Sequence, residues 1–221
     1  KPPARRVRRS VPQNAGRCYC WATSAETGEP CTALAATSGE GANLPYCDFH
    51  LRNGDGALQV VDHPTMKGVG KIVVARVDIP RGYKFVYWGK RVRWRGCQGP
   101  DKAMSFVPNG GVIDPTGCEG QQVQCMACPG PSERSNTKVT TVCFGKTYDR
   151  ALIGRELETT ELVKKGHQLL QWYGSKEWFE ARGIPRTNVG TEEYPTPQRK
   201  KKPKPMAPTG GKGKGKGKGQ E

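Results

Sequence analysis

The sequence predicts a mostly-β fold of short strands and long loops, with few short helices, between two basic ends that do not fold. The 221 residues give room for one ordinary domain and a small module rather than two large cores. Only 34% of them are hydrophobic, and 29 Gly and 18 Pro divide the chain into short pieces, as in loop-rich β domains. The apolar runs have strand length, far below the roughly 20 residues of a membrane-spanning helix, so we expect no membrane contact.

The strands are predicted from β-branched and alternating runs. Residues 71–77 predict a first strand, the Pro- and Gly-containing stretch 78–82 a turn, and the alternation at 83–87 a second strand. Further β-branched runs at 139–144 and within 151–160 extend the sheet, the latter as one or two short strands. Regularly spaced short strands with Gly/Pro turns are typical of an all-β domain.

One segment, residues 175–182, has the pattern of a helix. Ser175 is a candidate N-cap, and the Gly-Ile-Pro sequence at 183–185 ends the helix. The apolar block 169–173 precedes it, after a turn at 165–166. After Pro185 the composition becomes rich in Lys, Gly and Pro, which predicts that order ends there.

Most of the net charge of +16 lies at the two ends of the chain. Residues 1–17 contain six Lys/Arg and no acid, and residues 186–221 contain ten Lys/Arg against three acids. Basic, unfolded ends suit a polyanion, because neutralising its phosphates releases condensed counterions. We therefore expect DNA or RNA contact through the termini, and the basic cluster 199–204 is similar to a nuclear-import signal. The alternative is that the ends only keep the protein soluble.

The first half of the chain contains a candidate metal site. Cys18, Cys20, Cys31 and Cys47 fall within 30 residues, and His50 follows three residues after Cys47. Three thiolates and one imidazole are typical ligands of a structural Zn²⁺, and a segment with little core gains folding energy from a metal. The simplest ligand set is Cys20, Cys31, Cys47 and His50, with Cys18 as an alternative first ligand. The other interpretation is unpaired buried or reactive thiols.

A second cysteine pair, Cys125 and Cys128, has Cys-x-x-Cys spacing. Such a pair is half of a metal site, a redox pair or two core thiols. Because no histidine lies nearby and no βαβ pattern surrounds the pair, we favour core thiols.

Four segments, taken in order, resemble the SET family of protein-lysine methyltransferases, and the last resembles its PR-type branch. The family has a Gly-x-Gly sequence with a strand and an acidic turn, a strand ending in Tyr-x-Gly, an Ile-Asp-Ala/Pro-Thr turn and a Leu-Leu-Val-Trp-Tyr-Gly ending. Here these are GVGKIVVA with DIPRG at 68–82, FVYWG at 85–89, VIDPTG at 112–117 and GHQLLQWYG with WFEARGI at 166–184. Their shared order, rather than any one motif, makes the resemblance specific.

This resemblance implies a SET-type fold and an S-adenosylmethionine-dependent protein-lysine N-methyltransferase, with histone lysines as one candidate substrate. Tyr173 would be the catalytic tyrosine that orients the substrate amine. The implied cofactor-binding residues are Gly68, Gly70, Tyr87, Asn136 and Trp172. The chain then divides into a disordered basic arm (1–16), a zinc module (17–55), a SET-like domain (64–185) and a disordered Lys/Gly/Pro-rich tail (186–221).

The sequence departs from the family at one informative place. Most SET enzymes have an Asn-His pair that contacts the cofactor, and residues 126–128 of this chain, Met-Ala-Cys, stand at that position. PR-type domains also lack the pair, and some remain active. The alternative hypothesis is therefore a catalytically inactive SET-like scaffold or binding module that associates with nucleic acid or a ribonucleoprotein through its basic ends.

Overall fold

The computed structural model describes residues 19–37, 44–67, 69–106, 111–144, 152–174 and 177–199. The predicted basic arm 1–16, the tail from residue 200 onward, Cys18, Gly68 and the N-cap Ser175 lie outside the described residues.

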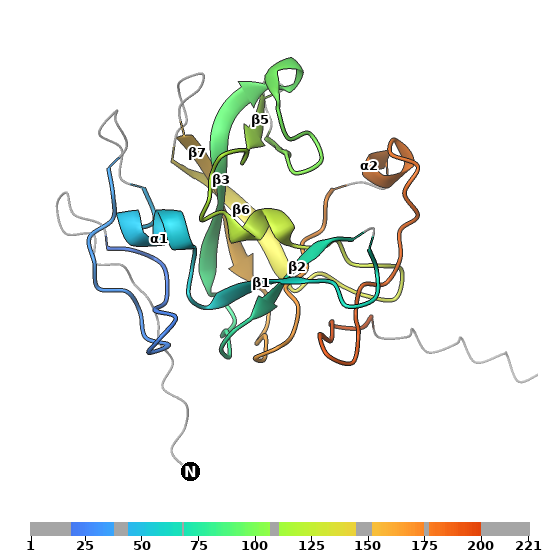
Figure 1. Cartoon of the computed structure of the whole chain (residues 1–221), viewed down its shortest axis with the longest axis horizontal. Helices are drawn as coiled ribbons and strands as arrows, with labels where there is room; N and C mark the ends of the chain where they lie inside the picture. Colours follow the sequence, from blue (N-terminus) through green and yellow to red (C-terminus); the bar gives the residue numbers. More distant parts are fainter. Residues whose placement is uncertain are drawn as a thin grey trace, which may run out of the picture.

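The main sheet has five antiparallel strands in the order β4-β5-β3-β7-β6 (Figure 1). Its long central strand is β3 (Lys84–Arg93), which pairs with β5 (Gly111–Asp114) on one side and β7 (Leu152–Thr159) on the other. β4 (Met104–Phe106) and β6 (Thr137–Phe144) form the edges. A separate hairpin joins β1 (Leu58–Asp62) to β2 (Lys71–Ala75).

Helical structure is short everywhere in the described chain. It comprises α1 (Asp48–Asn53), the 3₁₀ turns η1 (Trp94–Gly96) and η2 (Gln122–Cys125), and α2 (Glu177–Glu180). The mostly-β prediction is thereby confirmed. None of the helices in the described residues has the length and apolarity that crossing a membrane would require.

Both faces of β3 are buried, each by a different part of the chain. Phe85 and Tyr87 point into a core shared with Ile153 and Leu157 of β7, where the hairpin β1–β2 and η2 cover the sheet. Val86 and Trp88 point the opposite way into a second core, covered by the N-terminal segment and α1. Figure 1 shows α1 on one side of β3 and the hairpin on the other. Alternation along one strand therefore builds two cores.

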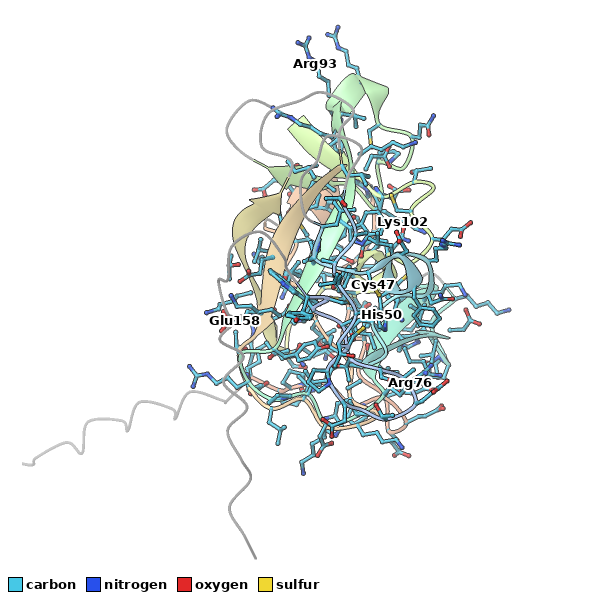
Figure 2. All side chains as sticks on the ribbon, turned by 90° about the vertical axis from the view of Figure 1, so that its left-hand side faces the viewer. Cys47, His50, Arg76, Arg93, Lys102 and Glu158 are labelled. Carbon is cyan, nitrogen blue, oxygen red and sulfur yellow. The ribbon has the colours of Figure 1, made fainter. Side chains whose placement is uncertain are left out.

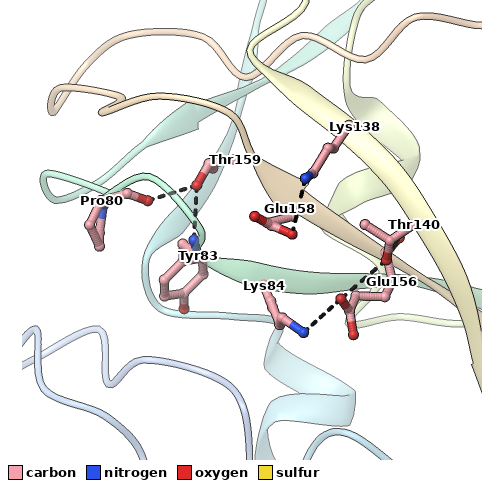
Figure 3. A network of polar contacts seen from close by, with 8 residues as sticks. All are labelled: Pro80, Tyr83, Lys84, Lys138, Thr140, Glu156, Glu158 and Thr159. Atoms are coloured by element: carbon pink, nitrogen blue, oxygen red, sulfur yellow. Dashed lines mark hydrogen bonds and ion pairs between the residues drawn. The ribbon is translucent and has the colours of Figure 1, made fainter. Parts of the chain in front are cut away.

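Polar contacts fix how β3, β7 and β6 pair (Figure 3). Lys138 of β6 stands opposite Glu158 of β7 with 3.4 Å between the charged atoms, and Lys84 of β3 reaches Glu156 of β7 at 2.9 Å. The buried Thr159 hydroxyl donates to the Pro80 carbonyl at 2.7 Å and so anchors the end of β7 to the turn before β3. A slip of one residue would move each side chain to the wrong face, so these contacts support one register.

The block 166–171 runs beside β2 rather than joining the main sheet. The Leu169 N–H donates to the Val73 carbonyl at 2.9 Å, and the Gln171 N–H donates to the Ala127 carbonyl at 3.0 Å. Leu169 and Leu170 are fully buried between these two neighbours. The segment is thus held on both sides before it reaches Tyr173.

Residues 186–199, which we call the C-terminal strap, are packed on the domain, and the prediction that order ends at Pro185 is wrong for them. The strap surrounds Glu133, whose side chain is fully buried. The carboxylate of Glu133 accepts hydrogen bonds from the Gly190 N–H at 2.7 Å, the Thr196 hydroxyl at 2.7 Å and the Val189 N–H at 3.0 Å. The strap's polar composition concealed this packing, because it is held by hydrogen bonds to one buried charge rather than by an apolar face.

Other sequence predictions differ from the structure in extent. The strand predicted at 83–87 continues to Arg93, the region 151–160 forms one strand, and the predicted helix is the single turn α2 in the described residues. β1, β4 and β5 were not predicted. Strands of three to five residues have too few side chains for alternation to stand out, and long-range pairing decides them.

We expect Glu133→Gln to lower the free energy of unfolding by about 2–3 kcal/mol, because hydrogen bonds to a charged group contribute about 1.5–3 kcal/mol each. Denaturant unfolding measures the loss, and hydrogen exchange at Val189 and Gly190 should show that the strap opens first. Glu192→Gln is the matched control, since Glu192 is an exposed acid of the same strap. Equal stability of the two variants would contradict the role of Glu133.

Candidate functional site

Four side chains of the N-terminal segment converge as the sequence predicted. The ligand atoms of Cys20, Cys31, Cys47 and His50 all lie within 4.8 Å of one another. Nδ1 of His50 is 3.2 Å from the Cys47 sulfur and 3.4 Å from the Cys20 sulfur. A tetrahedral zinc ion with bonds of about 2.3 Å to sulfur and 2.0–2.1 Å to nitrogen separates such ligands by about 3.5 Å. The donor set and spacing therefore fit Zn²⁺.

Two local structures bring these ligands together. Cys47 stands at the start of α1, and His50 follows one helical turn later, so both side chains lie on the same face (Figure 2). Cys20 and Cys31 come from an irregular hairpin, in which the Cys20 N–H donates to Ala33 and the Cys31 N–H to Ala22, both at 2.9 Å. Within the described residues this is the one group of three or more such ligands that lie this close.

The chemistry of the cluster depends on proton loss. Burial raises the pKa of the Cys20 thiol to about 12, and burial lowers the pKa of His50. The imidazole is thus neutral and able to bind a metal at neutral pH, whereas the Cys20 thiol releases its proton only when a metal replaces it. Zinc affinity should therefore rise with pH.

The cluster is continuous with the β domain rather than a detached module. Cys20 and Cys47 share a core with Val86 and Trp88 of β3. A second link is Asp55, which is buried directly after α1. Its carboxylate accepts hydrogen bonds from the Thr23 N–H at 2.8 Å and the Tyr83 hydroxyl at 2.6 Å. Burial raises the pKa of Asp55, and these bonds oppose that rise. The segment that contains the Cys/His cluster thus packs on one face of β3 and is hydrogen-bonded to the residue that precedes that strand.

A cavity of about 470 Å³ opens on the other face of the main sheet. It contains Tyr87, Trp172 and Tyr173, three of the residues that the sequence analysis assigned to the catalytic and cofactor-binding site. Trp94 and Trp178 also line it, so its wall includes five aromatic side chains. The remaining lining residues are Asp101, Lys102, Ala103, Met104, Ser105, Val123, Gln124, Met126, Val139, Arg155, Leu157, Gln171 and Gly174.

Tyr173 is fixed at both ends of its side chain. Its hydroxyl donates to the Met126 carbonyl at 2.7 Å, and its ring contacts Trp178 edge-on at 4.9 Å and stacks on Phe179 at 6.1 Å between centroids. Desolvation by the protein around the hydroxyl, reinforced by the nearby thiols of Cys128 and Cys125, raises the pKa of Tyr173 above its usual range, although the residue as a whole is 38% exposed. The hydroxyl is therefore protonated at neutral pH, as its hydrogen bond to the Met126 carbonyl requires.

Tyr87 and Trp172 complete the aromatic wall from different elements. Tyr87, in the middle of β3, donates its hydroxyl to the Lys102 carbonyl, and burial raises its pKa well above the usual range. The Arg186 guanidinium of the strap lies 4.6 Å from the centre of the Trp172 ring. Strand, loop and strap thus all contribute to the position of these rings.

Arg155 is a cavity residue that sequence reasoning missed. It stands directly opposite Tyr87 in the β3–β7 register, and its Nη1 donates to the Ser105 carbonyl at 3.3 Å. Its Nε is buried and has no hydrogen-bond partner among the described residues. Burial also lowers the pKa of its guanidinium. The sequence did contain a sign of this. Arg155 lies two residues after Ile153 and two before Leu157, so strand alternation predicts that its side chain faces inward with theirs.

Two of the predicted cofactor residues do not line the cavity. Gly70 is exposed in the β1–β2 turn, with φ of 69°, and its carbonyl accepts from the His63 N–H. Asn136 is buried, and its amide bonds the Gln168 carbonyl and the Leu170 N–H, both at 2.8 Å. Both lie near the strap, since His63 Nε2 and Gln168 Nε2 each contact the Val189 carbonyl.

Cys125 and Cys128 are free thiols, half-buried and buried respectively, which agrees with the core-thiol interpretation. Burial raises the pKa of both. Since thiolates rather than thiols react, this argues against a redox role.

No protein-family model matches this sequence, and the search of curated proteins also finds no match. Among solved structures the chain is similar to one described as ctPRC2 in an autoinhibited conformation bound to S-adenosylmethionine. The two are 13% identical with a TM-score of 0.39, over 66% of this chain and 20% of the other. The chain thus spans about a fifth of that protein's length, and a likeness of this size carries no argument about function.

We expect the purified full chain to bind one zinc ion and Cys47→Ser to abolish that stoichiometry, because a closed site needs all four ligands. Metal analysis by mass spectrometry measures the content, and unfolding with and without a chelator measures the stabilisation. Cys97→Ser is the control, since Cys97 lies outside the cluster. Zinc content that is near zero in the folded wild type, or unchanged in Cys47→Ser, would contradict the site.

Proposed function

We propose that this protein is an S-adenosylmethionine-dependent protein-lysine N-methyltransferase whose reaction takes place in the aromatic cavity. The observation that carries the proposal is that Tyr87 lines one cavity with Trp172 and Tyr173, a pair far from it in sequence, and that the Tyr173 hydroxyl is held in place there. The volume of about 470 Å³ falls within the range of about 300–1,000 Å³ for small-molecule sites.

The residues of the cavity suit the groups that such a reaction brings together. When bound, S-adenosylmethionine supplies a methyl group on a positively charged sulfur. Aromatic faces attract both a sulfonium and a lysine ammonium. The positive side chains of Lys102 and Arg155 in the lining lower the pKa of a nearby ammonium, so they favour the neutral amine that the reaction requires. The protonated Tyr173 hydroxyl can then orient that amine, and positioning alone lowers the barrier of an in-line transfer substantially.

A second candidate is a binding module of the same shape without catalysis. It is favoured by the position of Gly70 and Asn136, which lie outside the cavity and near the strap. Such a module would hold a lysine side chain between the aromatic rings and transfer nothing. The two candidates differ in cofactor binding, which the module does not need.

We further propose that the Cys/His cluster binds a structural Zn²⁺ and that the basic ends of the chain contact a nucleic acid. Four protein ligands close a zinc site, so the ion stabilises the fold and takes no part in the reaction. The second proposal is supported by the concentration of positive charge in residues 1–17 and 200–218. A nuclear location and histone substrates remain predictions from the sequence.

Tyr173→Phe should lower kcat/KM for methylation of a lysine-containing protein by about 100-fold, because the variant loses the hydroxyl that orients the amine. A transfer assay with radiolabelled S-adenosylmethionine measures the change, and calorimetry measures cofactor binding separately. Tyr19→Phe, which alters a largely exposed tyrosine, is the control. If the wild-type chain does not bind S-adenosylmethionine at millimolar cofactor concentration, the enzyme proposal is wrong and the binding module is favoured.

Removal of residues 200–221 should flatten the salt dependence of DNA or RNA binding, because each lost phosphate contact reduces the logarithmic slope by about 0.7–0.9. Fluorescence anisotropy at several salt concentrations measures the slope. A full-length variant with the lysines of residues 200–218 replaced by Gln separates charge from length. If truncation leaves the slope unchanged, the tail does not contact the nucleic acid.

A further inference from the structure

The aromatic cavity contains one polar group that the fold leaves unsatisfied. Arg155 lines it from β7, and its Nε is buried without a hydrogen-bond partner among the described residues. Within the described residues, the one hydrogen bond of its guanidinium runs from Nη1 to the Ser105 carbonyl. The Nε itself has almost no accessible surface, so a ligand would bond the guanidinium through its terminal nitrogens; the guanidinium lines the cavity and has no acidic partner among the described residues, which leaves this bonding capacity open to a ligand.

The charge around Arg155 is not neutralised by the protein. The other charged lining residues are Asp101 and Lys102. Asp101 forms an ion pair with Arg182 at 2.9 Å, whereas Lys102 has no ion pair among the described residues. Arg93 and Arg95 are exposed on either side of Trp94, whose half-exposed ring also lines the cavity. Among the residues that line the cavity, Lys102 and Arg155 therefore outnumber the single acid, Asp101, which is already paired.

The aromatic rings and the Arg155 guanidinium of the cavity favour ligand groups of opposite charge. The rings of Tyr87, Trp172 and Tyr173 attract a cation. A cation placed there alone would be repelled by Arg155, which stands opposite Tyr87 on the neighbouring strand. A carboxylate on the same ligand removes that repulsion and bonds the guanidinium, a pairing whose planar geometry is well matched. The preferred ligand therefore has a cation and a carboxylate a few bonds apart.

We propose that Arg155 is the carboxylate-binding residue of the cavity and that the protein selects ligands in which a carboxylate accompanies the alkyl cation. This rests on the proposed function only in that a lysine or a sulfonium enters the cavity. Two sources have this chemistry: an Asp or Glu close to the target lysine of the substrate, and the amino-acid end of S-adenosylmethionine. In the first case the substrates are acidic segments around lysine rather than uniformly basic ones.

The experiment uses the full chain and two pairs of probes in calorimetry. The first pair comprises capped peptides with a single lysine and either Glu or Gln at each of the neighbouring positions. The second pair is S-adenosylmethionine and its decarboxylated form. We expect the wild type to bind the carboxylate-bearing member of at least one pair about tenfold more tightly and Arg155→Gln to bind both members equally.

Arg76→Gln is the matched control, because it removes the same charge from an exposed arginine outside the cavity. Figure 2 shows Arg76 at the opposite end of the molecule from Arg93, the residue that precedes Trp94 of the cavity lining. Arg155→Lys, which keeps the charge without the fork of donors, should keep part of the preference. If Arg155→Gln does not fold, the proposal is tested by two other measurements. These are the preference of the wild type within each probe pair and the reduced preference of Arg155→Lys.

A preference in the peptide pair that Arg155→Gln removes assigns the carboxylate to the substrate, and a preference in the cofactor pair assigns it to the cofactor. Absence of any preference in the wild type, absence of binding by all four probes, or a preference that Arg155→Gln retains overturns the proposal. Methyl transfer is measured separately. Carboxylate selection without transfer defeats the enzyme proposal alone, and transfer without selection defeats the Arg155 proposal alone.

Discussion

The burial of β3 on both faces is the constraint on which the rest of the structure depends. Its side chains alternate between two cores, so each face needs a cover that the five-stranded sheet cannot provide. One cover is the hairpin β1–β2 with η2 and the block 166–171, and the other is the N-terminal Cys/His segment with α1. Because the same strand joins both cores, loosening either cover exposes apolar surface next to the other.

This arrangement relates the Cys/His cluster to the cavity even though they lie on opposite faces of the sheet. Trp88 packs against the segment that holds Cys20 and Cys47, and its neighbour Tyr87 lines the cavity. Several large apolar residues of the segment around the cysteines, Tyr19, Leu34 and Phe49, are about half exposed or more and add little to its core. A bound ion would supply the free energy that its packing lacks, and would thereby hold the backbone of β3 on which the aromatic wall is built.

Electrostatics inside the domain follow two different rules. Glu133 is buried and fully satisfied, because backbone N–H groups and a hydroxyl of the strap surround its carboxylate. Arg155 is partly buried and incompletely satisfied, and the space next to it is a cavity rather than packed protein. The first charge holds a segment of the chain in place. The second leaves binding capacity for a ligand, which is the physical difference between a structural and a functional polar residue.

The sequence by itself determined the mostly-β class, the Cys/His composition of the candidate metal site and the aromatic block that ends in Tyr173. These depend on local chemistry: Cys47 and His50 are one helical turn apart, and ligand type indicates the nearby cysteines, with Cys18 and Cys20 as alternatives. Only the tertiary structure decided that the strap packs on Glu133, that Asn136 bonds backbone rather than lining the cavity, and that a cavity lies where Arg155 faces inward. Each of these contacts joins elements distant in sequence, and their pairing is set by burial and hydrogen bonding across the whole fold, which no local pattern encodes.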